Sequence, residues 1–283
     1  MSINIYGEDP PELLYKYLPS RLKTEQGEVI PYFETDHKLR FSQPSACNDI
    51  YECYPNLEKL AAPETNLFDN PNFWKNAKLS HLSSKEREIY KKRALEETSN
   101  DPSWRITTSN NFKRNYLDKK LHFLCLSESW ESPAMWGLYT NNTGIALGFD
   151  LSTFKEDNSN LVFVFHKVIY NESRPEISTL EPEPDELIAI QITKSKEWEY
   201  EQEWRLSSLR REDLDNLEVS RDPEKLSVLG KEIPIDYLRE IIFGVNCDQE
   251  TIQQIQDIIP DHVKIYKAKQ HYTSYKLDRD TMT

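Results

Sequence analysis

The feature that most restricts the fold of this chain is a period of two in residues 198–205, WEYEQEWR. A period of two is typical of a β-strand, because successive side chains of a strand point to opposite faces. One face of the predicted strand is mostly aromatic: Trp198, Tyr200, Gln202 and Trp204. The other face is charged: Glu199, Glu201, Glu203 and Arg205. We therefore expect a strand that presents carboxylates either to water or to a ligand that requires an acid.

Glu201 and Glu203 lie two residues apart and are expected to share the charged face. Neighbouring carboxylates can have different pKa values and divide catalytic roles between them. One can bind a hydroxyl or stabilise a developing cation while the other orients or deprotonates a nucleophile. Arg205 on the same face gives the alternative, a solvated strand face whose charges balance. Trp198 and Trp204 are expected in the core or as a platform beneath a ligand.

Strand-like runs recur along the chain and set the predicted fold class. They occupy residues 11–21, 120–129, 143–151, 161–170 and 263–270. Residues 187–198 begin as a helix, and another helix, capped by Cys247 or Asp248, follows a strand that ends at Gly244. Helices and strands are segregated rather than strictly alternating. We therefore expect a single α+β domain over residues 1–283.

Residues 70–118 interrupt this pattern with a charged, helix-prone segment whose apolar residues have mixed helical spacings. They predict a helical insertion within the single domain. At its end, residues 112–120, FKRNYLDKK, form a basic cluster with interleaved aromatic groups. Such a cluster is typical of single-stranded nucleic-acid sites, and a solvated helix face explains it equally well.

Composition excludes several classes of protein. The 283 residues are 37% hydrophobic and 29% charged, which indicates a globular chain, and the net charge of −13 argues against broad binding to nucleic acid. No apolar run approaches the length of a membrane span, and the first residues lack a signal-peptide pattern, so we expect a cytoplasmic protein without membrane contact. The seven glycines form no phosphate-binding loop.

The four cysteines and six histidines suggest no metal site. Cys47, Cys53, Cys125 and Cys247 lack the close paired spacing of a structural zinc site, and we expect reduced, structural thiols. The histidines lack the H-E-x-x-H spacing of metalloproteases.

A second group of candidate residues follows the strand at 120–129. Ser127 and Glu128 close that strand, where ligands commonly bind. Trp136 and Tyr139 are three residues apart, the spacing of one helical face, and either stack on a flat heterocycle or fill the core. No histidine lies near Ser127 in the sequence, so a Ser–His hydrolase has little support.

A third group lies at residues 48–52, NDIYE. We expect a helix to begin here after a turn at 44–49, with Ser45 or Asn48 as its cap. Capping and the helix dipole explain Asn48 and Asp49 without a function. Glu52, one turn later, is the stronger candidate for a binding role.

These segments occur in an order that resembles the bacterial domain-of-unknown-function 2971 family. The matching stretches are LYKY near the start, NDIYEC, LCLSES followed by MWGLY and TGIALGFD, and W-x-YEQEWR. The resemblance runs from about residue 13 to 245. The chain departs from the family pattern at Ile50, where proline is common, and at Leu126, where phenylalanine is common.

A weaker resemblance carries an activity. The order of a first strand with a polar residue, a serine-ended strand and an E-x-E strand is similar to the ADP-ribosyltransferase fold, which implies a split, mostly antiparallel central sheet. In such enzymes the last glutamate binds the ribose of NAD, which is the substrate. The resemblance implies that Glu203 is the catalytic acid and Glu201 assists the acceptor, with the opposite assignment left open. It also implies that Tyr15 or Lys16 of the first strand contacts the dinucleotide, although transferases have Arg or His where this chain has Lys16. Tyr17 on the same strand is a further candidate for substrate binding.

Two hypotheses follow for the function. The first is an NAD-consuming ADP-ribosyltransferase or NAD glycohydrolase, of the kind that serves as a toxin or anti-phage effector, acting on a protein or nucleic-acid acceptor. It predicts that Glu201, Glu203, Ser127 and Trp136 converge on one pocket. The second is a non-catalytic module of the same fold, a partner subunit of a defence or toxin–antitoxin system. It predicts that Arg205 or Lys194 engages both carboxylates.

Overall fold

The computed structural model describes most of the chain. The described residues are 4–6, 9–23, 29–31, 38–56, 74–75, 79–100, 103–113, 117–118, 121–151, 161–177, 183–210, 229–232 and 235–282.

A nine-stranded sheet forms the centre of this described part, in the order β1-β8-β11-β6-β2-β7-β13-β14-β15. Its strands are β1 (Asn4–Tyr6), β2 (Leu14–Leu18), β6 (His122–Ser127), β7 (Ile145–Phe149), β8 (Leu161–Lys167), β11 (Glu203–Arg210), β13 (Leu238–Phe243), β14 (Lys264–Gln270) and β15 (Leu277–Thr281). Neighbouring strands are antiparallel except for the β1–β8 and β13–β14 pairs. The predicted α+β class with a mostly antiparallel sheet is therefore confirmed.

The sheet is nearly divided between β6 and β2. The ladder between these strands contains one residue pair, Tyr15 with Ser127, whereas β6 pairs with β11 over six positions. Lys16 reaches across the gap, and its Nζ donates to the carbonyl oxygen of Cys125 at 3.0 Å. The two halves of the sheet therefore diverge from one point, which leaves backbone edges and side chains of both strands available to line a pocket.

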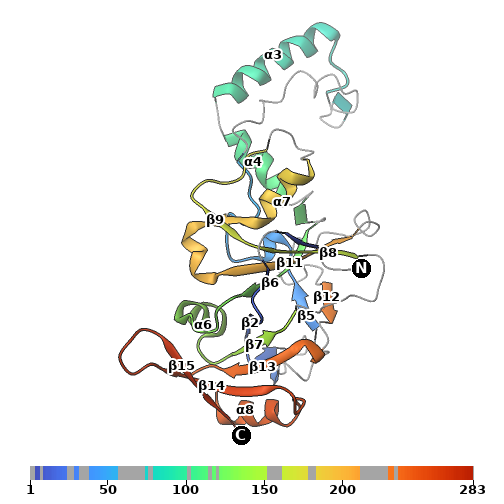
Figure 1. Ribbon diagram of the computed structural model, residues 1–283. Coiled ribbons are helices and arrows are strands. Elements are labelled where there is room, and N and C mark those ends of the chain that lie inside the picture. The colour runs from blue at the N-terminus through green and yellow to red at the C-terminus, as the bar shows by residue number, and fades with distance from the viewer. Residues whose placement is uncertain are drawn as a thin grey trace.

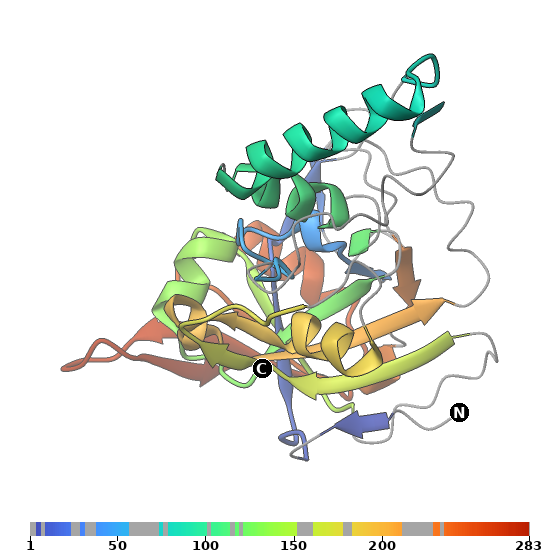
Figure 2. The same cartoon turned by 90° about the horizontal axis from the view of Figure 1, so that it is seen from above.

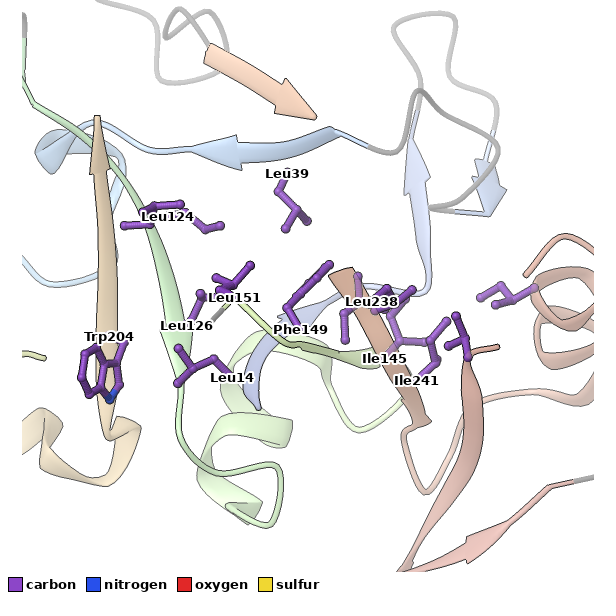
Figure 3. Close-up of a cluster of buried hydrophobic side chains, with 14 of the residues drawn as sticks. Leu14, Leu39, Leu124, Leu126, Ile145, Phe149, Leu151, Trp204, Leu238 and Ile241 are labelled. Atoms are coloured by element: carbon purple, nitrogen blue, oxygen red, sulfur yellow. The ribbon is translucent and has the colours of Figure 1, made fainter. Parts of the chain in front are cut away.

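One face of the sheet packs into the largest apolar core. The alternate residues Leu124 and Leu126 of β6 join Trp204 of β11 and Phe149 of β7 in this core, and all four are buried. Figure 3 shows Leu39 of β5 (Lys38–Phe41) pointing toward these side chains from outside the sheet. The alternation predicted for Trp204 is confirmed, because it lies in the core while Glu203 and Arg205 point to the other face.

The other face of the sheet is covered by two smaller cores. Helix α6 (Pro133–Thr140) packs with β2 in one of them, around Trp136 and Tyr17. Helix α7 (Pro184–Ile192) packs in the other, where Ile190 joins Phe123 of β6. Polar and charged residues of β6 and β11 lie on the same face as these two cores, and they form the site described below.

Shorter elements complete the described part of the chain. Two-stranded sheets pair β3 (Arg21–Lys23) with β4 (Val29–Pro31), β5 with β12 (Leu229–Glu232), and β9 (Ile169–Asn171) with β10 (Thr193–Ser195). Three 3-10 helices are η2 (Pro44–Ala46), η4 (Lys196–Glu201) and η6 (Ile235–Tyr237). Helix α8 (Gln249–Gln256) is capped by Asp248, whose side chain accepts from the backbone N–H of Thr251. Asp248 was one of the two caps predicted for this helix.

Within the described part of the predicted insertion at 70–118, the two long helices confirm its helical character. They are α3 (Ser84–Asn100) and α4 (Ser103–Phe112). Figures 1 and 2 both show α3 at the edge of the molecule beside α4, and in Figure 1 α7 lies between α4 and the sheet. The basic cluster at 112–120 lies partly outside the described residues, and within it Lys113 and Asp118 are buried.

Two local predictions are wrong. Residues 198–205 are not one strand, because the 3-10 helix η4 occupies Lys196–Glu201 and Gln202 adopts a left-handed conformation (φ 45°) before β11 begins at Glu203. No helix begins at Asn48, where the chain instead makes turns that continue to Cys53. The Asp49 carboxylate accepts from the backbone N–H of Tyr51 at 2.8 Å, so it caps a turn rather than a helix.

The described helices include none that is both long enough and apolar enough to cross a membrane. Within the same residues, no group of three or more His, Cys, Asp or Glu side chains is arranged to hold a metal ion. The four cysteines are free thiols.

Candidate functional site

A pocket opens where the two halves of the sheet diverge, and we call it the acid pocket. It is lined by β2, by β6, by the turns at 46–52, by α6 and by the segment that joins β10 to β11. Its open volume is about 130 Å³. Since one water molecule needs roughly 10–15 Å³ of such space, the pocket suits a group of about ten non-hydrogen atoms.

One row of residues crosses the sheet at this pocket. Tyr15 of β2 pairs with Ser127 of β6, and Ser127 pairs with Glu203 of β11. All three are buried and line the pocket. The Ser127 hydroxyl donates to the backbone carbonyl of Glu201 at 2.6 Å, which holds the end of η4 against the end of β6. The second residue of β2, the last residue of β6 and the first residue of β11 are therefore brought together.

Arg205 anchors a buried group of charged side chains behind the pocket. Its guanidinium is fully buried and makes a two-bond contact with Glu52, at 2.7 and 2.9 Å. It also donates to both oxygens of Glu203, at 2.8 and 3.1 Å, and stacks over the ring of Phe123 at 4.6 Å. A further bond to the carbonyl of Gln191 ties it to the end of α7. A planar guanidinium can satisfy this many acceptors at once, whereas an ammonium cannot.

Lys194 on β10 is the second cation of this group. Its Nζ donates to Glu203 Oε2 at 3.0 Å and forms a short hydrogen bond to Glu201 Oε2. Glu52 Oε2 lies 3.9 Å away, and the ring of Trp198 lies beneath the ammonium at 4.8 Å. Lys194 therefore bridges all three carboxylates. We call the five residues Glu52, Lys194, Glu201, Glu203 and Arg205 the ion cluster.

The ion cluster contains three carboxylates and two cations, so one negative charge is not balanced within it. Glu203 contacts both cations, and Glu52 is paired with Arg205 through two bonds. Glu201 contacts Lys194 and accepts from the Tyr139 hydroxyl at 2.5 Å. Burying an uncompensated carboxylate is costly, and protonation relieves that cost. Glu201, which contacts one cation, is the carboxyl best placed to hold the extra proton.

The pKa shifts of Glu201 and Glu203 agree with this placement of the extra proton. Burial raises the pKa of Glu201 above its usual value, and Glu203 adds to this effect, although Lys194 and Tyr139 oppose it. Burial also disfavours the charged form of Glu203, but Arg205 and Lys194 outweigh this and hold the pKa of Glu203 well below its usual range. The two neighbouring carboxyls are therefore separated in proton affinity, as in enzymes where two carboxylates have different roles.

The turns that follow η2 form one wall of the pocket. Asn48, Asp49 and Glu52 all line it, although the predicted helix is absent. Asp49 and Glu52 are buried, and Asn48 is exposed. Glu52 points inward to Arg205. The segment therefore reaches the pocket through turns rather than through a helix, and its binding role stays a prediction.

Most predicted site residues meet at the acid pocket. Those that line it are Tyr15, Lys16, Tyr17, Asn48, Asp49, Glu52, Ser127, Tyr139, Glu201 and Glu203. Arg205 lies behind it in the ion cluster, with no exposed surface.

Two predicted site residues do not line the pocket. The indole of Trp136 is buried against Tyr17, with ring centroids 5.2 Å apart, and donates to the carbonyl of Trp130. It does not line the pocket with the acids, because the α6 residues that do so are Met135 and Tyr139, four positions apart, and Trp136 is turned away into the core. Glu128 instead accepts from the Trp204 indole at 2.7 Å and pairs with Lys167 at 2.9 Å.

Sequence reasoning assigned no site role to several residues that line the pocket. Ser42, Cys47 and Cys125 are among them, and the two cysteines were expected to be structural. Lys194 was considered as an ion-pair partner of the acids. Its place in the sequence, just before an acidic and aromatic segment, did not indicate that it would contact three carboxylates. These contacts depend on the 3-10 helix η4, where the sequence pattern predicted a strand.

A further buried carboxylate, that of Glu240, lies behind the wall of the acid pocket that Tyr15 forms. Tyr15 donates through its hydroxyl to Glu240 Oε1 at 2.9 Å, and Arg279 of β15 makes a short contact to the same oxygen. The guanidinium of Arg279 lies over the rings of Tyr266 and Trp130, at 4.0 and 4.8 Å. A Cβ at Gly148 would lie 2.7 Å from Glu240, so glycine is required there. We call Glu240 and Arg279 the balanced pair.

Comparison with known families gives one result. The model of the family described as "Protein of unknown function (DUF2971)" matches residues 135–206. The resemblance to this family is confirmed over that segment, which contains most of α6, with Tyr139, and the E-x-E stretch through Arg205. The matched segment thus includes four of the five residues of the ion cluster. No curated protein and no solved structure matches the chain.

Proposed function

We propose that the protein is an NAD-consuming enzyme, an ADP-ribosyltransferase or NAD glycohydrolase, in which Glu201 is the catalytic acid–base residue. The observation that carries this proposal is the charge imbalance of the ion cluster at a pocket between two half-sheets. It leaves one carboxyl, Glu201, that can exchange a proton beside a bound ligand. Glu203 was the first choice from the sequence, but its contacts with both cations favour a structural and electrostatic role.

The row formed by Tyr15, Ser127 and Glu203 supports the resemblance to ADP-ribosyltransferases. In that resemblance the first strand, the serine-ended strand and the E-x-E strand all contribute to one nicotinamide–ribose pocket. Here β2, β6 and β11 are neighbours, with β6 in the middle. The volume of the acid pocket suits a nicotinamide ring, with Tyr15 and Tyr17 among the lining residues as candidates to stack on it.

The chemistry requires no metal ion and no glycine-rich loop. The bond between the nicotinamide nitrogen and the ribose carbon breaks with its electron pair leaving on nicotinamide, and the ribose gains oxocarbenium character. Above its raised pKa, Glu201 has released its proton to solvent, and the carboxylate accepts a hydrogen bond from a ribose hydroxyl and stabilises this positive charge. Water or an acceptor group then bonds to the ribose carbon, and its proton passes to Glu201. A carboxyl with a raised pKa is a stronger base for this step than an ordinary one.

The test is release of nicotinamide from NAD by purified protein. We expect release by the wild type and a loss of about 100-fold or more in Glu201→Gln, because general acid–base groups typically contribute that much. Glu199→Gln is the matched control, since Glu199 is an exposed carboxylate on the same 3-10 helix. Wild-type protein that releases no nicotinamide, or Glu201→Gln that releases it at the wild-type rate, would contradict the proposal.

A non-catalytic binding module is the second candidate, and one observation favours it. Lys194 contacts both Glu201 and Glu203, as that hypothesis predicted. In this case NAD or a related ligand would bind without turnover, and the protein would act as a partner subunit in a defence or toxin–antitoxin system. Isothermal titration with NAD, measured beside nicotinamide release, separates the two: binding with no product supports the module, and binding with product supports the enzyme.

A further inference from the structure

A second cavity shares Lys194 as a wall with the acid pocket. Its open volume is about 240 Å³, and its lining comes from the turn at 51–54, from residues 171–175 and from the start of β10. The turn at 51–54 separates the two cavities, because Glu52 lines the acid pocket while Tyr51 and Tyr54 line the second one. We call this second cavity the Arg174 pocket.

The guanidinium of Arg174 lies over two aromatic rings of this cavity. It is 5.5 Å from the ring centre of Tyr51 and 5.1 Å from that of Tyr54. Arg174 is exposed, and among the described residues no carboxylate lies within ion-pair distance of it. The rings hold one face of the guanidinium, and its N–H donors remain available.

Other arginines that lie over aromatic rings donate their N–H groups to acceptors within the protein. Arg205 donates to Glu52 and Glu203. Arg279 donates to Glu240, and Arg87, over the ring of Trp74 at 5.0 Å, donates to two backbone carbonyls. Arg174 thus differs from these three arginines in having no hydrogen-bond acceptor among the described residues.

The backbone around Arg174 is fixed before any ligand binds. The Asn171 side chain accepts from the backbone N–H groups of Glu172 and Ser173, at 2.8 and 3.5 Å, and closes a turn. Asn56 then donates to the carbonyl of Pro175 at 2.7 Å and accepts from Ile177 at 3.2 Å. This bridge joins the arginine segment to the tyrosine segment. A preorganised cation loses less conformational entropy when it binds an anion.

The remaining lining suits an oxyanion. Hydroxyl groups of Ser173, Thr193 and Ser195 lie along the cavity and can donate hydrogen bonds. The one carboxylate in the lining, Glu172, is exposed to solvent. Guanidinium groups bind phosphate through two parallel N–H···O bonds, and a phosphate has further oxygens for the hydroxyls.

We propose that the Arg174 pocket is a binding site for a phosphate monoester, such as a nucleoside monophosphate or a phosphorylated sugar. Arg174 binds the phosphate oxygens, and the hydroxyls of β10 and of the 171–173 turn complete the site. Binding here does not require that the acid pocket cleave NAD.

The test compares adenosine monophosphate with adenosine by isothermal titration, in wild type, Arg174→Gln, Arg87→Gln and Glu201→Gln. We expect wild type to bind the monophosphate at least tenfold more tightly than adenosine, since a charged hydrogen bond contributes about 1.5–3 kcal/mol. This preference should disappear in Arg174→Gln and be partly restored in Arg174→Lys. Arg87→Gln is the matched control, because it removes a ring-stacked arginine elsewhere, and it should keep the preference.

Two results would overturn the proposal. They are wild type that does not prefer the monophosphate, and Arg174→Gln that retains the preference. If Arg174→Gln retains the preference and Glu201→Gln loses it, the phosphate binds in the acid pocket. None of these results depends on nicotinamide release, so a failure of the proposed enzymatic activity leaves this test intact.

Discussion

The ion cluster and the balanced pair each contain a buried carboxylate that accepts a hydrogen bond from a tyrosine lining the acid pocket. Tyr139 donates to Glu201 in the first, and Tyr15 donates to Glu240 in the second. The balanced pair sets one carboxylate against Arg279, whereas the ion cluster sets three against two cations. The difference indicates that the balanced pair is structural, and that the ion cluster holds a proton that can be exchanged.

The largest expected effect is the loss of Arg205. Arg205→Met leaves Glu52 and Glu203 buried with little compensation, and breaking a buried ion pair in this way costs about 3–5 kcal/mol of unfolding free energy. Arg279→Met should cost less than half as much, because Arg279 is partly exposed and Tyr15 still donates to Glu240. Urea denaturation measures both. Equal losses would show that the two groups do not differ in the way proposed.

The next effect is the dependence of stability on pH. The pKa of Glu201 is raised in the folded state, so the folded protein binds more protons than the unfolded chain above the ordinary carboxyl pKa. Stability from this group is therefore present at low pH and is lost as the pH rises through the raised pKa, with a slope of at most about 1.4 kcal/mol per pH unit. Glu201→Gln should remove this decline.

The titration of His166 changes the stability in the opposite direction over part of the same pH range. The pKa of His166 is lowered to about 4, mainly by burial. Stability from this group is therefore lost as the pH falls below about 6.5, the ordinary pKa of histidine. Subtracting the Glu201→Gln curve from the wild-type curve cancels this contribution. A difference curve that is flat with pH, or that rises with pH, would contradict the assignment of the proton to Glu201.

The fold could be predicted from the sequence where a strand has one apolar face. The alternation of Glu203, Trp204 and Arg205 gave their faces correctly, because β11 is buried on both sides and its period follows backbone geometry. The same rule failed for Lys196–Glu201, where a 3-10 helix intervenes. Glu201 still reaches Glu203, because the left-handed residue Gln202 turns the chain back toward the pocket.

The partners of the charged residues could not be predicted in the same way. Glu52 and Arg205 are 153 positions apart in the sequence, and nothing in either segment indicates that they meet. The stacked arrangement of Arg174 with Tyr51 and Tyr54 likewise depends on a bridge between two turns. Local pattern specifies which face a side chain occupies, whereas these contacts depend on how distant segments pack.

The smallest expected effects come from the two tyrosines. Tyr139→Phe and Tyr15→Phe each remove one hydrogen bond to a carboxylate, and each should lower the unfolding free energy by about 1.5 kcal/mol, the low end for a hydrogen bond to a charged group. Tyr139→Phe alone should also raise the pKa of Glu201 further, because the Tyr139 hydroxyl favours its ionised form. The pH profile of nicotinamide release should then move to higher pH in Tyr139→Phe and stay in place in Tyr15→Phe. Profiles that move together would remove the distinction between the two groups.

The central claim, that the ion cluster holds one exchangeable proton on Glu201, is tested most directly by nuclear magnetic resonance of protein labelled with ¹³C at the glutamate side-chain carboxyls. We predict one signal that titrates above the ordinary glutamate range, is absent in Glu201→Gln, and persists in Glu199→Gln. A spectrum in which every glutamate signal titrates at or below the ordinary range, or in which the high signal survives Glu201→Gln, would contradict the account.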